Sequence, residues 1–291
     1  MRFIIPIPVL LALVFSIGCI AQVPNNGLVV SLIPDPATVL VNGETSLHVD
    51  VSNTDVKNVS NVKAEVFNSG LLSPVQDCSQ RGILGDMRAG EFRTFFCDFR
   101  APKINQDRVT TTLDVRATYE SEFPAYQQLQ VISEDEYNNR LASGNYHELP
   151  RSYVYSDRNI QMQLDFSDPL PLVLRDGRNY FVRFTITNIG NGFIGNIMPD
   201  DVRILQKPGL EFSDEGQFLQ SVNLLGHYEP CRLEQVIYPN GNKFPSFVCR
   251  IVLPPKPQPP LKETPITDYN FIVLLHYKYE IRQSARVDII R

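Results

Sequence analysis

Residues 46–54 read SLHVDVSNT, and their alternation of apolar and polar side chains is typical of a β-strand with one buried face. The same pattern recurs in residues 180–190, YFVRFTITNIG. The apolar residues are Leu47, Val49 and Val51 in the first stretch and Val182, Phe184 and Ile186 in the second. Asn53 and Asn188 end the two runs, where an Asn side chain can bond the backbone of a turn. The chain therefore contains a repeated strand-and-turn unit.

The repeat continues downstream of these strands. Residues 95–102, FFCDFRAP, match residues 247–254, FVCRIVLP, in having an aromatic residue two places before a cysteine and a proline five places after it. Each unit also has a second strand candidate, at 62–67 and 201–206, and a final one, TTTLDVRATYE at 110–120 and NFIVLLHYKYE at 270–280. This order predicts two copies of one β-rich unit.

The cysteines fit an exported protein. Of five, Cys19 lies near the N-terminus and the other four form two close pairs, which suggests disulfides. Sequence alone does not fix the connectivity, but a link within each repeat is favoured, Cys78 with Cys97 and Cys231 with Cys249. Each pair is expected to staple a hairpin, closing a loop of about twenty residues and contributing ~3 kcal/mol. Neither pair has the C-x-x-C spacing of a zinc site, so no metal is expected.

Each unit holds roughly seven short strands without helical periodicity, as in an immunoglobulin-like sandwich. We therefore predict an all-β protein with two tandem immunoglobulin-like β-sandwiches, residues 25–132 and 153–291. The apolar strand that ends in Asn, of the form V-x-V-x-N, resembles the CARDB-like and related Ig-like modules of bacterial and archaeal envelope proteins. This resemblance implies a fold and, by analogy, a stalk or adhesion role, and it transfers no site residue.

Residues 133–152 separate the two units. Ser133 and Glu136 fit a helix capping box, acidic residues follow Ser133, and Gly144 can end a helix. We predict a short helix over about 134–142 that packs at the junction and sets the angle between the units. The alternative is an exposed flexible linker.

The N-terminal residues 1–21 resemble a signal peptide or lipoprotein signal, with Arg2 before an apolar stretch. Gly18 and Cys19 resemble a lipobox, in which the cysteine receives a lipid, although Ser16 stands where Leu is usual. The alternatives are secretion with cleavage after Ala21, and an uncleaved anchor. All three place the rest of the chain outside the cytoplasm, either attached to the outer face of a membrane or secreted.

No catalytic motif or cofactor fingerprint occurs, and the four histidines are scattered. The net charge of −5 argues against nucleic acid as a partner. Two acidic pairs, Asp200-Asp201 and Asp214-Glu215, could supply oxygen ligands for calcium. Their spacing does not match a calcium-binding loop, so we expect them to be solvated loop carboxylates. The expectation is no catalytic residue, no metal and no cofactor.

Two further features are candidates for surface roles. Asn58-Val59-Ser60 is a glycosylation sequon in an expected loop. Five tyrosines near the linker are expected to pack the two units together or to form an exposed aromatic patch that binds a ligand or glycan. They are Tyr126, Tyr137, Tyr146, Tyr153 and Tyr155.

The sequence therefore predicts a non-enzymatic cell-envelope protein with a structural, adhesive or scaffolding role. Its expected partners are other envelope or surface proteins and, through a lipid on Cys19, the membrane. The alternative is a secreted ligand- or glycan-binding module that uses the tyrosines near the junction.

Overall fold

The computed structural model describes residues 27–175, 178–208, 233–251 and 266–291. Within these ranges the chain is almost entirely β, which confirms the predicted all-β class. The exceptions are one α-helix, α1 (Glu134–Ala142), and one short 3-10 helix, η1 (Pro199–Asp201). None of the helices in the described ranges is long and apolar enough to cross a membrane.

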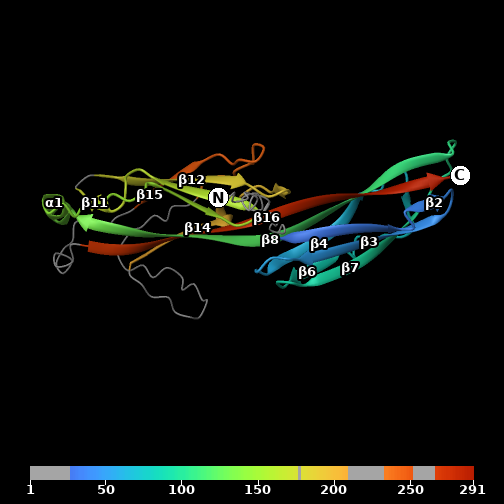
Figure 1. Ribbon diagram of the computed structural model, residues 1–291, viewed down its shortest axis with the longest axis horizontal. Coiled ribbons are helices and arrows are strands. Elements are labelled where there is room, and N and C mark those ends of the chain that lie inside the picture. Colours follow the sequence, from blue (N-terminus) through green and yellow to red (C-terminus); the bar gives the residue numbers. More distant parts are fainter. Residues whose placement is uncertain (1–26, 176–177, 209–232, 252–265) are drawn as a thin grey trace, which may run out of the picture.

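The molecule is elongated, with two lobes joined along one pair of long strands (Figure 1). The long strands are β8 (Arg108–Ser133) and β16 (Ile266–Ile290). The first lobe adds β1 (Leu28–Asp35), β2 (Thr38–Leu40), β3 (Glu44–Asn53), β4 (Val59–Asn68), β5 (Ser73–Pro74), β6 (Ile83–Met87) and β7 (Phe92–Arg100). The second lobe adds β9 (Ser152–Ser156), β10 (Ile160–Phe166), β11 (Leu172–Leu174), β12 (Tyr180–Asn188), β13 (Phe193–Ile194), β14 (Val202–Pro208) and β15 (Phe247–Ile251).

The two long strands pair antiparallel without interruption, from Ile266↔Ile132 to Ile290↔Arg108. Their register places Tyr119 opposite Tyr279, close to the midpoint of β8. We call this pair of strands the ribbon, and the region around Tyr119 and Tyr279 the waist. The ribbon forms the centre of an eight-stranded sheet, β13-β16-β8-β4-β6, which β2, β11 and β14 also join.

Two four-stranded sheets, β1-β3-β7-β5 and β15-β12-β10-β9, complete the lobes. The buried residues of β8 keep odd numbers from Leu113 in the first lobe to Val131 in the second. Because side chains of a strand alternate between its two faces, both cores must lie on the same face of the shared sheet. The opposite face of the ribbon therefore points away from both cores, and of its residues Ile132, Asn270 and Leu274 are also buried.

The expected final strands at 110–120 and 270–280 are much longer in the structure. In β8 the alternation continues through Phe123, Ala125 and Leu129, all buried in the second lobe. Each repeat therefore supplies half of a long strand to the other lobe. The ends are covered alike: β2 pairs parallel with residues 288–290, and β11 pairs parallel with residues 131–133. Whether residues 25–132 and 153–291 behave as separate units stays a prediction, since each long strand runs through both lobes.

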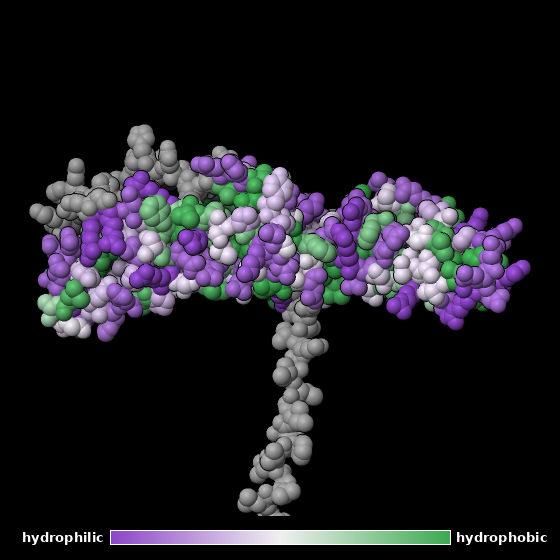
Figure 2. Space-filling view, turned by 90° about the horizontal axis from the view of Figure 1, so that it is seen from above, coloured by the Kyte–Doolittle hydropathy of each residue, from purple (hydrophilic) through white to green (hydrophobic). Residues whose placement is uncertain are grey.

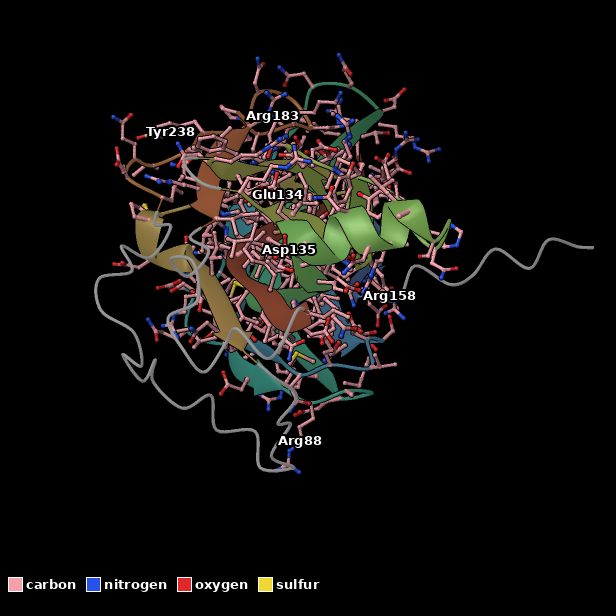
Figure 3. The ribbon with its side chains drawn as sticks, turned by 90° about the vertical axis from the view of Figure 1, so that its left-hand side faces the viewer. Arg88, Glu134, Asp135, Arg158, Arg183 and Tyr238 are labelled. Carbon is pink, nitrogen blue, oxygen red and sulfur yellow. A yellow bond between two sulfur atoms is a disulfide. The ribbon has the colours of Figure 1, made fainter. Side chains whose placement is uncertain are left out.

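The helix predicted over residues 134–142 is confirmed, and Ser133 Oγ accepts a hydrogen bond from Glu136 N at 3.1 Å. Its expected place at the junction is wrong. Figures 1 and 3 show α1 lying across one end of the molecule, and it buries none of its residues. The reason is that β8 continues to Ser133, so the chain reaches the far end of the second lobe before the helix begins.

The disulfide Cys78–Cys97 is confirmed, with Cα atoms 5.7 Å apart. The hairpin expected between these cysteines is wrong, because β6 pairs with β4 in the shared sheet whereas β7 pairs with β3 in the covering sheet. The disulfide therefore ties the segment before β6 to the buried middle of β7. Cys249 is also disulfide-bonded. Cys231 lies outside the described residues, so its pairing with Cys249 stays a prediction.

Candidate functional site: a polar groove at the waist

Tyrosines from both halves of the ribbon meet at the waist. The rings of Tyr119 and Tyr279 have centroids 5.7 Å apart. Asn159, in the loop before β10, donates from Nδ2 to the hydroxyls of Tyr119 (2.8 Å) and Tyr277 (3.1 Å). Tyr277 in turn donates to Asp157 Oδ2 at 2.9 Å. Burial raises the pKa of Tyr119 and Tyr277 well above the ordinary value, so both hydroxyls keep their protons.

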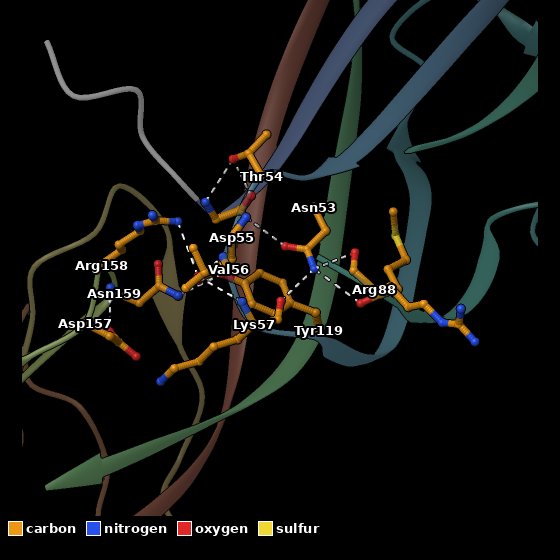
Figure 4. Close-up of polar contacts among 12 residues, drawn as sticks. Asn53, Thr54, Asp55, Val56, Lys57, Arg88, Tyr119, Asp157, Arg158 and Asn159 are labelled. Atoms are coloured by element: carbon orange, nitrogen blue, oxygen red, sulfur yellow. Dashed lines mark hydrogen bonds and ion pairs between the residues drawn. The ribbon is translucent and has the colours of Figure 1, made fainter. Parts of the chain in front are cut away.

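The turn after β3 meets this network from the first lobe (Figure 4). The fully buried Asn53 donates from Nδ2 to the carbonyl oxygens of Lys57 (2.9 Å), Met87 (3.2 Å) and Arg88 (3.0 Å). Its Oδ1 accepts from the backbone N of Asp55 at 3.1 Å. The Asp55 carboxylate lies 3.4 Å from Arg158 Nη1 in the second lobe, so the two lobes are in direct contact here.

The second repeat builds the same turn with Asn188. Its Nδ2 donates to Gly192 O at 2.7 Å, and its Oδ1 accepts from Gly190 N at 3.2 Å. The offsets of four and two residues equal those of Asn53 with Lys57 and Asp55. The predicted turn role of both asparagines is confirmed.

A groove of about 1020 Å³ opens on the outer face at the waist. Glu120 and Glu122 of β8 and His276 of β16 lie along it, because even-numbered ribbon residues point away from the cores. Ser121 of β8 also lines the groove, and the first lobe supplies the rest of the lining: Asn58, Val59, Ser60, Asp86, Met87, Arg88, Ala89, Gly90, Glu91 and Arg93. A smaller hollow of about 310 Å³ adjoins it and shares Glu122 and His276.

His276 lies between carboxylates. Its Nε2 is 3.8 Å from Glu120 Oε2, its Nδ1 is 3.6 Å from Asp201 Oδ1, and Glu122 is its partner across the ribbon. Glu120 also accepts a hydrogen bond from Asn61 Nδ2 at 2.6 Å. When His276 is protonated, it can pair with either flanking carboxylate.

The opposite wall of the groove carries an arginine–glutamate pair. Glu91 lies 2.6 Å from Arg93 Nη2 and accepts a hydrogen bond from the backbone N of Arg88 at 2.7 Å. The hydrogen bonds from Arg88 N and the Arg93 side chain hold the pKa of Glu91 below its usual value. Arg88 projects to the outside of the molecule (Figure 3). The groove thus offers both signs of charge.

The lining of the groove offers hydrogen-bonding groups and charges of both signs. Among the described residues no group of three or more His, Cys, Asp or Glu side chains is arranged to hold a metal ion. No hydrogen bond joins His276 to a hydroxyl in those parts of the chain. What the lining supplies is hydrogen bonding and paired charges, which suit a polar or mixed-charge ligand.

One arginine of β16 contacts aromatic rings from both repeats. The guanidinium of Arg282 lies 4.7 Å from the ring centre of Phe193 and 5.6 Å from that of Phe67. Phe193 belongs to β13 of the second repeat and Phe67 to β4 of the first, so one side chain contacts both. Figure 2 shows hydrophilic side chains along the whole body, with smaller hydrophobic areas between them.

The five tyrosines considered from the sequence do not gather into one patch. Tyr137 of α1 packs edge to face on Tyr146 at the far end of the second lobe, with ring centroids 4.8 Å apart. Tyr153 and Tyr155 both belong to β9. Tyr153 packs on Phe166, and the hydroxyl of Tyr155 donates to Gln127 Oε1 at 2.7 Å. Tyr126 lies on the outer face of β8 and donates to Asn270.

The other sequence candidates are placed as follows. Asn58 is exposed on the rim of the groove, and its Oδ1 accepts from Ala89 N at 3.1 Å. Asp200 and Asp201 form η1 and line the smaller hollow. Cys19 and the pair Asp214-Glu215 lie outside the described residues.

His276, which lines both hollows, is one of the four histidines that are scattered in the sequence. Its carboxylate neighbours Glu120 and Glu122 lie more than 150 positions away in the chain. Only the register of the ribbon brings them together. The alternation of β8 beyond residue 120 is the signal that could have revealed a longer strand.

No protein-family model matches the chain, and no curated protein sequence matches it either. Among solved structures, the chain is similar to "Secreted serine protease VesC from Vibrio cholerae". The two share 10% sequence identity over 90% of this chain and 51% of that chain, with a TM-score of 0.21. The protein in that solved structure is named as a serine protease. The expectation that the present chain is not an enzyme is therefore withdrawn. A TM-score of 0.21 carries no argument for protease activity.

Proposed function

We propose that this protein is an extracytoplasmic envelope protein with a structural or scaffolding role, held at the membrane by a lipid on Cys19. It would bind a partner in the waist groove and hold it at a fixed position. The observation that carries this proposal is the ribbon, whose two strands pair without interruption through both lobes. Because both strands run through both lobes, we expect the two lobes to move together as one body.

The lobes themselves are proposed to be a pair of Ig-like sandwiches, each with its own disulfide. Supporting this, the covering sheets share an order: β1-β3-β7 in the first lobe corresponds to β10-β12-β15 in the second. Cys97 of β7 and Cys249 of β15 occupy matching strands, and both are disulfide-bonded. The second bridge is proposed to join Cys249 to Cys231.

The proposed partner is another envelope or surface protein. Polar and charged residues make up most of the groove's lining, with Glu120 and Glu122 on the ribbon and with Arg88 and Arg93 beside Asp86 and Glu91 in the first lobe. Such mixed charge favours specificity for a polypeptide surface of complementary pattern. Glycan binding through the junction tyrosines is the competing proposal, and the dispersal of these tyrosines gives it no continuous aromatic surface.

A site-specific crosslinking experiment tests the groove. A photoreactive residue replaces Glu122 in the groove or, as a matched control, Arg286, which is exposed on the same outer face of β16 in the first lobe. Crosslinking in native envelopes should give one recurrent protein adduct from position 122 and none from position 286. The same adduct from both positions, or none from either, would count against the groove as the binding surface.

The membrane tether is tested separately by Cys19→Ala. The variant should be released from membranes on fractionation, whereas the parent chain is retained. A glycan array with parent protein and Tyr153→Ala tests the competing proposal, and tyrosine-dependent binding would favour it.

A further inference from the structure

The described chain enters the molecule at its waist. The backbone N of Gly27 donates to Thr54 Oγ1 at 3.1 Å, and Thr54 N donates back to Gly27 O at 2.8 Å. A Cβ atom on Gly27 would lie 4.0 Å from the hydroxyl of Tyr119. Since Tyr119 is near the midpoint of β8, Gly27 lies about halfway between the two ends of the body.

The length of the body follows from β8. Its 26 residues, at about 3.3 Å each, span roughly 85 Å. Each end therefore lies about 43 Å from the waist.

The distance between a lipid on Cys19 and the body of the protein is limited by the length of chain between Cys19 and Gly27. We call this segment the tether. Cys19 precedes Gly27 by eight residues, and eight residues span at most about 29 Å in any conformation. A body standing upright on such a tether would push its lower half about 14 Å below the lipid surface, since 43 Å exceeds 29 Å by that amount.

We infer that the anchored protein lies along the membrane, as a crossbar held at its middle, with its long axis within about 40° of the lipid surface. This inference rests on the proposed lipid on Cys19. The two ends of the body then lie on opposite sides of the tether, each no more than roughly 60 Å above the lipid surface. The protein would connect partners side by side in the plane of the membrane, whereas a stalk would raise one partner above it.

Neutron reflectometry of the full-length lipidated protein on a supported phosphatidylcholine bilayer tests the orientation. The protein layer should be clearly thinner than the roughly 85 Å length of the body. A layer of that length or more would overturn the inference. A control with a long Gly/Ser insertion between Cys19 and Gly27 should give a thicker, more diffuse layer, because its tether no longer limits the tilt.

The anchor and the orientation fail in different ways. If the parent chain does not stay on the bilayer, or if Cys19→Ala stays equally well, the proposed tether is wrong. If the parent chain stays through Cys19 but forms the thick layer, only the crossbar orientation is wrong.

Discussion

Tyr119 and Tyr279 face each other across the ribbon with ring centroids 5.7 Å apart, and they occupy the same place in the two repeats. Each is followed by the glutamate that ends the strand predicted for its repeat. Equivalent residues that pair with each other mark the centre of an approximate two-fold relation. Beyond this point, each long strand leaves its own lobe and completes the other.

Because each long strand runs through both lobes, the alternation of buried and outward side chains must continue unbroken through the waist. Inserting one alanine between Ser121 and Glu122 would turn Phe123, Ala125 and Leu129 away from the second core. We expect the second lobe to lose at least ~3 kcal/mol of unfolding free energy, because several apolar side chains become exposed. Denaturant unfolding and limited proteolysis measure this loss.

The matched control is a two-alanine insertion at the same place, which restores the alternation and should be much less destabilising. Equal stability of the two variants would mean that residues beyond 121 act as a linker rather than as part of a continuous strand.

The buried turn asparagines give a second prediction. Asn53→Ala removes the donor of three hydrogen bonds and leaves the buried Met87 carbonyl and two partly buried carbonyls without this partner, so it should cost ~2–4 kcal/mol of unfolding free energy. Asn188→Ala removes one Nδ2 bond, to Gly192 O, and should cost less. Chemical denaturation of both variants provides the comparison, and an equal or larger cost at Asn188 would contradict the hydrogen-bond explanation.

The confirmed disulfide gives a third prediction. Replacing both Cys78 and Cys97 by alanine should lower the unfolding free energy by ~3 kcal/mol, because the bridge closes a loop across 19 positions of the unfolded chain. Denaturation without reductant isolates this bridge. Mass spectrometry of the unreduced digest should still show Cys249 in a disulfide, and a link to Cys78 or Cys97 in the parent protein would refute pairing within each repeat.

The tyrosines give a prediction about alkaline pH. Burial raises the pKa of Tyr155 to about 12 and raises that of Tyr279 as well. The unfolded chain loses these protons near pH 10, before the folded chain does. The stabilising effect is therefore complete below pH 10 and is lost as the pH rises toward 12.

Thermal unfolding at pH 9, 10, 11 and 12, with phenolate absorbance recorded in parallel, should show a steep loss of stability above pH 10. Tyr155→Phe should reduce the slope, because one shifted group is removed. A slope that matches the parent protein would show that Tyr155 does not contribute.

Local patterns predicted the elements they encode. Alternation at 46–54 and 180–190 predicted β3 and β12, the capping box at Ser133 predicted α1, and cysteine spacing predicted the first disulfide. These features depend on contacts along short stretches of chain. The prediction of a hairpin between Cys78 and Cys97 was wrong because sheet membership depends on long-range contacts. The local sequence does not reveal which sheet each strand joins.

The sequence by itself determined the β class, the repeat, the turn asparagines and the position of the helix along the chain. Only the tertiary structure decided that the two final strands are shared, that α1 lies at one end of the molecule, and that His276 meets Glu120 and Glu122. The physical reason is that strand pairing joins residues about 160 positions apart through backbone hydrogen bonds. Those bonds are the same for any side chain, so no local pattern records which partner or register is formed.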